Sequence, residues 1–186
     1  MALTYSTSVK LHEPIPLFEL PDASGKTYTL GNWADKNVLV MVFACNHCPY
    51  SQAVRPQLIE LWNKLQAQGK SVQFVAINPN DAETYPEDAT EKMKEERYAY
   101  PFPYLRDESQ EVARDFGAVC TPDIFVYDRN RHLQYRGRLN DSWQHPSQAT
   151  RHDLSDAIDC LLRGERCNVE QYPSMGCSIK WKQSGG

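Results

Sequence analysis

The sequence predicts an α/β domain in which helices flank a central mixed sheet. Two largely apolar runs, Val38–Ala44 and Ser71–Ile77, have the valine-rich composition of strands buried on both faces of a sheet. Between them lies a helical pattern, with Gly69 placed to end the helix and Pro56 expected to kink it. The apolar residues at helical spacing are Val54, Leu58, Leu61, Trp62 and Leu65.

Two pairs of short alternating segments predict antiparallel hairpins. The first pair, Leu17–Leu20 and Thr27–Leu30, flanks the turn residues Pro21–Gly25 near the N-terminus. The second pair, Asp123–Tyr127 and Leu133–Arg136, flanks a polar turn later in the chain. We therefore expect an N-terminal hairpin extension and a hairpin that completes the central sheet.

Three more helices are predicted from charge and apolar spacing. Asp88, with a glutamate three residues later, has the pattern of a capping box that opens a charged helix over Glu91–Tyr98. A second helix is expected over Ser109–Phe116, and an amphipathic one over Leu154–Leu162 that ends at Gly164. The first of these would be a helix inserted between the two strand–helix units.

Length and charge restrict the classes of function. At 186 residues and 21.3 kDa, the chain fits one domain over 1–186, with residues 165–186 as a C-terminal tail packed on it. The net charge of -4 offers no basic surplus for nucleic acid or anionic lipid, so neither partner is expected. The longest apolar run is too short to span a bilayer. Residues 1–8 lack the pattern of a secretory signal, so we expect a cytoplasmic protein whose six cysteines are reduced, catalytic or metal-bound.

The motif with the most chemical content is Cys45-Asn46-His47-Cys48, where the first buried strand meets the helix. A thiol at a helix N-terminus faces unpaired N–H groups and the positive end of the helix dipole, so we expect the pKa of Cys45 to be lowered. The two-residue gap lets the second thiol close a disulfide within the first turn. This combination of a low-pKa attacker and a nearby resolver suits disulfide exchange.

At this point the chain resembles thioredoxin-fold proteins over residues 14–162. The resemblance rests on Phe43–Cys48 and on the later triplet Cys120-Thr121-Pro122. The N-terminal hairpin and the insertion at Pro79–Tyr104 are similar to the redoxin branch, which includes the alkyl hydroperoxide reductase and thiol-specific antioxidant superfamily. The tail Pro173–Trp181, with its Gly-Cys-Ser-Ile-Lys-Trp motif, resembles one bacterial subgroup of these proteins.

The resemblance implies a role for several residues of the two motifs. Cys45 would attack a disulfide and Cys48 would resolve the mixed disulfide. Pro122 would be a cis-proline packed against the dithiol, and Thr121 would offer its backbone to an extended substrate segment. His47 would stabilise the thiolate and raise the reduction potential above the roughly -270 mV of thioredoxin, unless it is an exposed turn histidine.

The other cysteines allow two interpretations each. Cys120 is expected at the surface beside the dithiol, where it forms mixed disulfides or simply fits as a small residue. Cys177 becomes a third redox thiol if the tail folds back over the site, and is otherwise a packing residue. Cys160 lies off the apolar stripe of its helix and Cys167 lies in a polar stretch, so neither receives a role.

Two departures from the related patterns affect the mechanism. No acidic residue occurs in Val38–Ala44, so Asp81 and Asp123, which follow predicted strands, are the candidates to accept the proton of Cys48. Peroxiredoxins carry Pro and Thr seven and three residues before the peroxidatic cysteine. Those positions hold Val38 and Val42 before Cys45, and Met41 and Cys45 before Cys48. Arg136 or Arg138 could then supply charge to a peroxide.

The leading hypothesis is therefore a thiol-disulfide oxidoreductase with no bound cofactor and no metal. Its partners would be a protein or low-molecular-weight disulfide and an upstream thiol reductant. One alternative is a thiol peroxidase in which Cys45 becomes a sulfenic acid that Cys48 resolves. The other is a redox sensor or metallochaperone that binds a soft metal through Cys45, Cys48 and His47.

Overall fold

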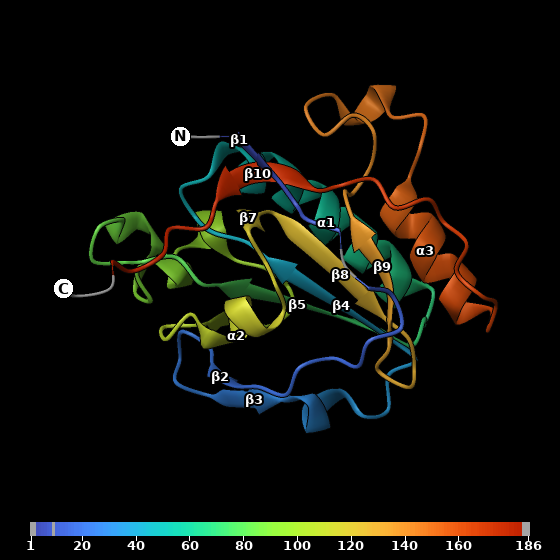
Figure 1. Cartoon of the computed structure of the whole chain (residues 1–186), viewed down its shortest axis with the longest axis horizontal. Coiled ribbons are helices and arrows are strands. Elements are labelled where there is room, and N and C mark those ends of the chain that lie inside the picture. The colour runs from blue at the N-terminus through green and yellow to red at the C-terminus, as the bar shows by residue number, and fades with distance from the viewer. Residues whose placement is uncertain (1–2, 9, 184–186) are drawn as a thin grey trace.

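The computed structural model describes residues 3–8 and 10–183, and its centre is a five-stranded mixed sheet (Figure 1). The strands lie in the order β6-β5-β4-β8-β9. β4 pairs in parallel with β5 and antiparallel with β8, and the outer pairs β5–β6 and β8–β9 are parallel and antiparallel respectively. The bounds are β4 (Val38–Phe43), β5 (Val72–Asn78), β6 (Tyr104–Arg106), β8 (Asp123–Tyr127) and β9 (Leu133–Gly137). The predicted mixed sheet and its second hairpin are confirmed.

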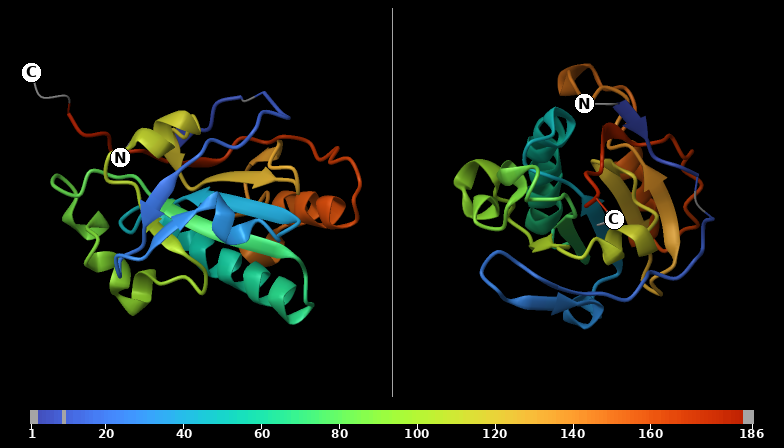
Figure 2. Two further views of the ribbon diagram at one scale, coloured as in Figure 1. Left: turned by 90° about the horizontal axis from the view of Figure 1, so that it is seen from below. Right: turned by 60° about the vertical axis from the view of Figure 1, so that its left-hand side comes forward.

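The two faces of this sheet are covered by different elements, because successive residues of a strand point to opposite faces. One face packs against α1 (Pro49–Ala67) and α3 (Asp153–Leu162), and it uses the even-numbered residues of β4. The other face packs against α2 (Glu111–Asp115) and the hairpin formed by β2 (Glu19–Pro21) and β3 (Thr27–Thr29). Figure 2 shows this hairpin and α1 on opposite sides of the sheet. All six residues of β4 are buried, so this strand is the middle of both cores.

Two helices end where the sequence analysis predicted, each just before a glycine. Gly69 follows α1 and Gly164 follows α3, both with the positive φ that lets a helix end in the left-handed region. Pro56 lies inside α1, and its predicted kink stays a prediction. No helix within residues 3–8 and 10–183 combines the length and apolarity that a membrane crossing requires.

The predicted inserted helix over Glu91–Tyr98 is wrong. The segment instead forms two short 3₁₀ turns, Lys92–Lys94 and Glu96–Tyr98, after a third at Pro86–Asp88. Its buried residues, Met93 and Tyr98, are five positions apart, which would place them on different sides of an α-helix. Without an apolar stripe to pack, the segment gains nothing from α-helical geometry.

A second, smaller sheet joins a strand near the start of the chain to one near its end and to a short strand before β8. Its strands lie in the order β1 (Leu3–Tyr5), β10 (Met175–Ser178) and β7 (Cys120–Thr121), with both pairs antiparallel. β7 leads directly into the Thr121–Pro122 peptide bond, which is cis, as predicted. The C-terminal strand therefore lies along the loop that precedes β8 (Figure 1).

Candidate functional site

The first feature of the site is the junction between β4 and α1, which carries both cysteines of the motif. α1 begins at Pro49, and Cys48 is its N-cap residue in an extended conformation. Proline suits this first helical position because its missing N–H would have no intrahelical partner anyway. Cys48, and not Cys45, therefore lies at the positive end of the helix, where the Ser51 N–H faces its sulfur.

The pKa values of the two thiols are shifted in opposite directions. The pKa of Cys48 is lowered to about 4 by its interaction with the Cys45 thiol and, against the opposing effect of burial, by contacts with Cys177 and the Ser51 N–H. Burial raises the pKa of Cys45 well above its ordinary value, and the neighbouring Cys48 and Asp88 add to this effect. The predicted low pKa of Cys45 is thus wrong, because burial raises this pKa and the N-cap of α1 is Cys48.

Thr121 contacts both thiols from the cis-proline loop. Its hydroxyl oxygen lies 3.2 Å from Cys45 Sγ, and its carbonyl oxygen lies 3.1 Å from Cys48 Sγ. A carbonyl accepts a hydrogen bond only from a protonated thiol, so this second contact opposes the acidity of Cys48. The structure thus brings Cys45, Cys48 and Thr121 together, with Pro122 directly after them in the chain.

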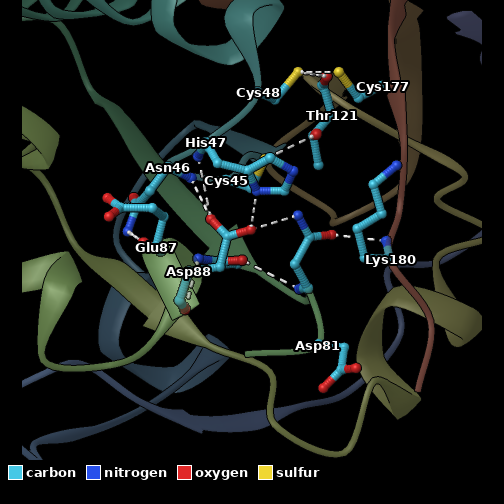
Figure 3. A network of polar contacts seen from close by, with 12 residues as sticks. Cys45, Asn46, His47, Cys48, Asp81, Glu87, Asp88, Thr121, Cys177 and Lys180 are labelled. Atoms are coloured by element: carbon cyan, nitrogen blue, oxygen red, sulfur yellow. Dashed lines mark hydrogen bonds and ion pairs between the residues drawn. The ribbon is translucent and has the colours of Figure 1, made fainter. Parts of the chain in front are cut away.

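The C-terminal tail adds a third sulfur to this group. Cys177 is paired with Thr121 in the register of β10 and β7, and its Sγ lies 2.8 Å from Cys48 Sγ. Figure 3 shows the side chains of Cys48 and Cys177 pointing toward one another. Cys45 and Cys48 are fully buried and Cys177 is 2% exposed, so the tail covers the thiols.

His47 is turned away from solvent and held by a carboxylate. Its Nδ1 lies 2.5 Å from Asp88 Oδ2 (Figure 3). Its ring stacks on Tyr85 with the centroids 5.1 Å apart. Its side chain is only 15% exposed, which differs from the exposed turn histidine that the sequence left open. The imidazole is therefore a fixed part of the site.

Asp88 is the residue that sequence reasoning assigned wrongly. Instead of capping a helix, it is fully buried and accepts hydrogen bonds from the Asn46 and His47 backbone N–H groups, the Asn80 side chain and His47 Nδ1. Burial raises its pKa, but these hydrogen bonds outweigh burial and lower the pKa below its ordinary value. A buried carboxylate thus lies under the dithiol motif, although no acidic residue occurs in β4.

The same residues supply a set of donor atoms of the kind that bind metals. One atom each from Cys45, His47 and Asp88 lie within 4.8 Å of one another. Both oxygens of Asp88 already accept protein hydrogen bonds, however, and a structural zinc site uses about four ligands. The arrangement favours a hydrogen-bonded carboxylate over a metal ligand.

The acidic residues that were predicted as proton acceptors have other partners. Asp81 accepts hydrogen bonds from the Glu83 N–H and the Thr84 hydroxyl, which is a local turn cap. Figure 3 shows it apart from the thiols. Asp123 is fully buried and forms a 2.7 Å ion pair with Arg136. The structure thus shows both carboxylates occupied in structural contacts.

The remaining predicted residues also differ from expectation. Arg136 is held by its ion pair with Asp123, and Arg138 pairs with Asp153 in α3. Cys120 is fully buried, not at the surface, because β10 covers β7, and burial raises the pKa of its thiol.

Arg55 is a cation near the dithiol that the sequence analysis missed. It is buried on α1, and its guanidinium donates to the Cys45 carbonyl oxygen at 3.3 Å and to the Arg97 carbonyl oxygen at 3.1 Å. The ring of Tyr100 lies 5.3 Å from its guanidinium carbon. The available signal was a charged residue next to Val54 in the apolar part of the helix.

Fold and site together define a thioredoxin-fold redoxin. The chain belongs to the AhpC/TSA family, whose model matches residues 11–136. The strands β4, β5, β6 and β8 fall within this match, as do Cys45, Cys48, Thr121 and Pro122, whereas Cys177 lies outside it.

Similar proteins extend the comparison over the whole chain. A conserved protein of Geobacillus kaustophilus has a solved structure with a TM-score of 0.91 and 41% identity, covering 100% of this chain and 99% of that one. A hypothetical protein of Sinorhizobium meliloti 1021 gives a TM-score of 0.89 and 39% identity, covering 97% and 100%. Among curated proteins, the thiol-disulfide oxidoreductase ResA of Geobacillus thermodenitrificans is 28% identical over 127 residues, or 68% of each chain.

Proposed function

We propose that this protein is a thiol-disulfide oxidoreductase whose redox dithiol is Cys45 and Cys48. The observation that carries the proposal is that both thiols contact Thr121 at the start of α1. The lowered pKa of Cys48 in addition favours a thiolate at this residue. The similarity to ResA supports it. The substrate would be a protein or low-molecular-weight disulfide, and a thiol reductant would restore the dithiol.

In this mechanism the attacking group is Cys48, because it is the N-cap residue of α1 and the Ser51 N–H faces its sulfur. This reverses the order that the family resemblance implies. The Cys48 thiolate attacks one sulfur of the substrate disulfide, forms a mixed disulfide and releases the first substrate thiolate. A second protein thiol then attacks Cys48 Sγ and expels the remaining substrate sulfur. Cys45 is one such thiol, and its own proton must leave before it attacks.

His47 is the group proposed to accept that proton. It lies close to Cys45 in the Cys45–His47–Asp88 group, and Asp88 fixes its ring orientation through Nδ1. Asp88 also raises the pKa of Cys45 through its negative charge, so the reduced pair holds a single thiolate. In this proposal His47 removes the proton of Cys45, whereas Asp88 raises the pKa of the same thiol.

The direct test follows the rate at which reduced protein reduces a model protein disulfide. Cys48→Ser should abolish the reaction, whereas Cys160→Ser should retain it, because Cys160 lies on α3 and contacts Arg163 and Glu165. Cys45→Ser/Cys177→Ser, which removes both thiols near Cys48, should accumulate a mixed disulfide on Cys48. A mixed disulfide that accumulates on Cys45 in Cys48→Ser would restore the opposite order of attack.

The pH dependence of thiolate absorbance gives an independent check. Because the pKa of Cys48 is lowered, the wild-type thiolate should persist at neutral pH and disappear only as the pH falls through about 4. Cys48→Ser should lose the thiolate that titrates near pH 4, and the buried Cys45 and Cys120 should not replace it, since burial raises the pKa of both thiols. A wild-type titration near free cysteine's roughly 8.5 would contradict the assignment.

A thiol peroxidase is the second candidate, and one contact favours it. The Thr121 hydroxyl, 3.2 Å from Cys45 Sγ, supplies the kind of donor that the upstream sequence pattern lacks. The raised pKa of Cys45 works against it, because a protonated thiol is a poor nucleophile. Loss of the Cys45 thiol that is faster with hydrogen peroxide than with a protein disulfide would favour the peroxidase.

A further inference from the structure

The C-terminal strand occupies the hydrogen-bonding edge beside the dithiol. β10 pairs with β7 at Cys177–Thr121 and Ser178–Cys120, and β1 pairs with the other edge of β10. The next residue continues the contact, because the Ile179 N–H donates to the Val119 carbonyl oxygen at 3.0 Å. Backbone pairing on both sides therefore sets the position of Cys177 against Cys48.

Gly176 shows that this approach requires a particular residue. A Cβ at this position would lie 2.0 Å from the Thr121 carbonyl oxygen and 2.5 Å from its carbonyl carbon. Both of these Thr121 atoms belong to the backbone, so they cannot rotate away from the added Cβ as a side chain could. Glycine is the residue that lets the strand approach this closely.

The segment after β10 is linked through Asn80 to Asp88, the carboxylate that holds His47. The Lys180 N–H donates to Asn80 Oδ1 at 2.9 Å, and the Asn80 side chain donates to Asp88 Oδ2 at 2.8 Å (Figure 3). The Lys180 carbonyl oxygen accepts hydrogen bonds from the Asp81 N–H and the Gln110 side chain. The tail is thus fixed both before and after Cys177.

We propose that Cys177 is a third redox-active cysteine, which resolves mixed disulfides on Cys48 by forming a Cys48–Cys177 disulfide. The sulfurs lie 2.8 Å apart, and the pair is covered by the protein. Cys177 is consequently a thiol of the chain itself that is already in reach when a substrate sulfur becomes bonded to Cys48. This inference rests on the proposed function and assigns a residue outside the C-x-x-C motif to the same reaction.

The step balances without a further reagent. The Cys48 thiolate first opens the substrate disulfide, which leaves one substrate sulfur bonded to Cys48. Burial and the neighbouring Cys48 thiolate raise the pKa of Cys177 to about 12, and the effect of Cys48 disappears once its sulfur is bonded to the substrate. Cys177 then loses its proton and attacks Cys48 Sγ, so the Cys48–Cys177 bond forms and the bond between Cys48 and the substrate breaks. The substrate sulfur leaves with the electron pair and takes a proton in place of the one that Cys177 lost. The substrate disulfide is reduced to two thiols while Cys48 and Cys177 are oxidised.

Glutathione disulfide added to the reduced protein provides the test, followed by acid quenching and peptide mapping by mass spectrometry. In Cys45→Ser, we expect a Cys48–Cys177 disulfide and roughly tenfold less glutathione on Cys48 than in Cys45→Ser/Cys177→Ser, because an intramolecular thiol competes with a high effective concentration. Cys45→Ser/Cys160→Ser is the matched control and should behave like Cys45→Ser. Equal glutathionylation in Cys45→Ser and in Cys45→Ser/Cys177→Ser would overturn the inference.

A second reagent separates this inference from the proposed function. If Cys48 does not react with glutathione disulfide in any variant, the proposed oxidoreductase activity fails. The thiol oxidant diamide, which needs no substrate recognition, then decides the remaining question in Cys45→Ser. A Cys48–Cys177 linkage would support the third redox cysteine, and its absence under diamide would exclude it.

Discussion

The strands β4 and β10 differ in what holds them. β4 is fully buried and contributes apolar side chains to the cores on both faces of the central sheet. β10 has four residues, two of them only half-buried, and is held by backbone pairing with β1 and β7 and by the polar contact of Lys180, two residues after the strand. The central sheet therefore depends on apolar burial, whereas the edge near the thiols depends on close backbone approach and hydrogen bonds.

This difference matters because the two regions meet at the dithiol. Cys45 follows β4 by two residues, and Cys177 belongs to β10. The stable sheet fixes one side of the site, and the weaker edge covers the other. Substitutions in the two regions should therefore affect different observables, either global stability or access to the thiols.

The largest expected effect is on the central sheet. Phe43 is fully buried and packs edge-on against Phe116 and Phe125, with ring centroids 5.3 Å and 5.7 Å apart. Phe43→Ala should lower the free energy of unfolding by about 3–5 kcal/mol, since it removes apolar contacts and leaves a cavity. Urea denaturation measures this change. Leu17→Ala, at an 83% exposed position, should stay within about 0.5 kcal/mol of wild type. Similar losses in the two variants would contradict the packing argument.

Hydrophobic patterning was sufficient to predict the central-sheet strands β4, β5, β8 and β9, whereas the short edge strand β6 was missed. The runs that became β4 and β5 are apolar because both of their faces are buried, and this property is visible in one dimension. The hairpin β2–β3 was also predicted, since turn residues separate two short alternating segments. These signals are local, so no knowledge of distant contacts was needed.

The site was predictable only in part. The meeting of Cys45 and Cys48 with Thr121 came from the resemblance to thioredoxin-fold proteins, not from any local pattern. The role of Asp88 could not be read from the sequence, because its partner Asn46 is 42 residues away and its own neighbours resemble a helix cap. The position of Cys48 as the N-cap depended on the exact start of α1, and helix boundaries are the least certain part of a sequence-based prediction.

The next largest effect should come from Asp88 itself. Asp88→Asn keeps the shape of the side chain but places an NH₂ group against hydrogen-bond donors. Some of the donors that now bond to the Asp88 carboxylate therefore lose their acceptor. We expect the free energy of unfolding to fall by about 2–3 kcal/mol, the range for hydrogen bonds to a buried charge. Asp22→Asn is the matched control: Asp22 also accepts backbone N–H groups, from Ser24 and Lys26, but at an exposed turn. A loss as large in Asp22→Asn would mean that burial is not the cause.

A smaller, local effect is expected from Gly176→Ala. Its Cβ would meet the backbone of Thr121, so β10 must move away while the central sheet stays folded. We expect Cys48 to be alkylated by iodoacetamide about tenfold faster, which corresponds to about 1.4 kcal/mol in the opening equilibrium. Gly31→Ala is the control, since its Cβ would have only an ordinary contact at 3.4 Å with the Thr29 side chain. An unchanged alkylation rate in Gly176→Ala would show that β10 does not limit access to the thiol.

The smallest effect tests whether the edge depends on single polar contacts. Thr121→Val removes the hydroxyl that lies 3.2 Å from Cys45 Sγ and keeps the side-chain shape. The free energy of unfolding should fall by about 1 kcal/mol, the typical net value of one buried hydrogen bond. Thr27→Val, at an exposed position of β3, should change it by less than about 0.5 kcal/mol. The Thr121 hydroxyl also lowers the pKa of Cys45. Its removal should therefore move the titration of the Cys45 thiol to higher pH without moving that of Cys48. A shift of both titrations would mean that Thr121 acts on the dithiol as a pair and not through its contact with Cys45.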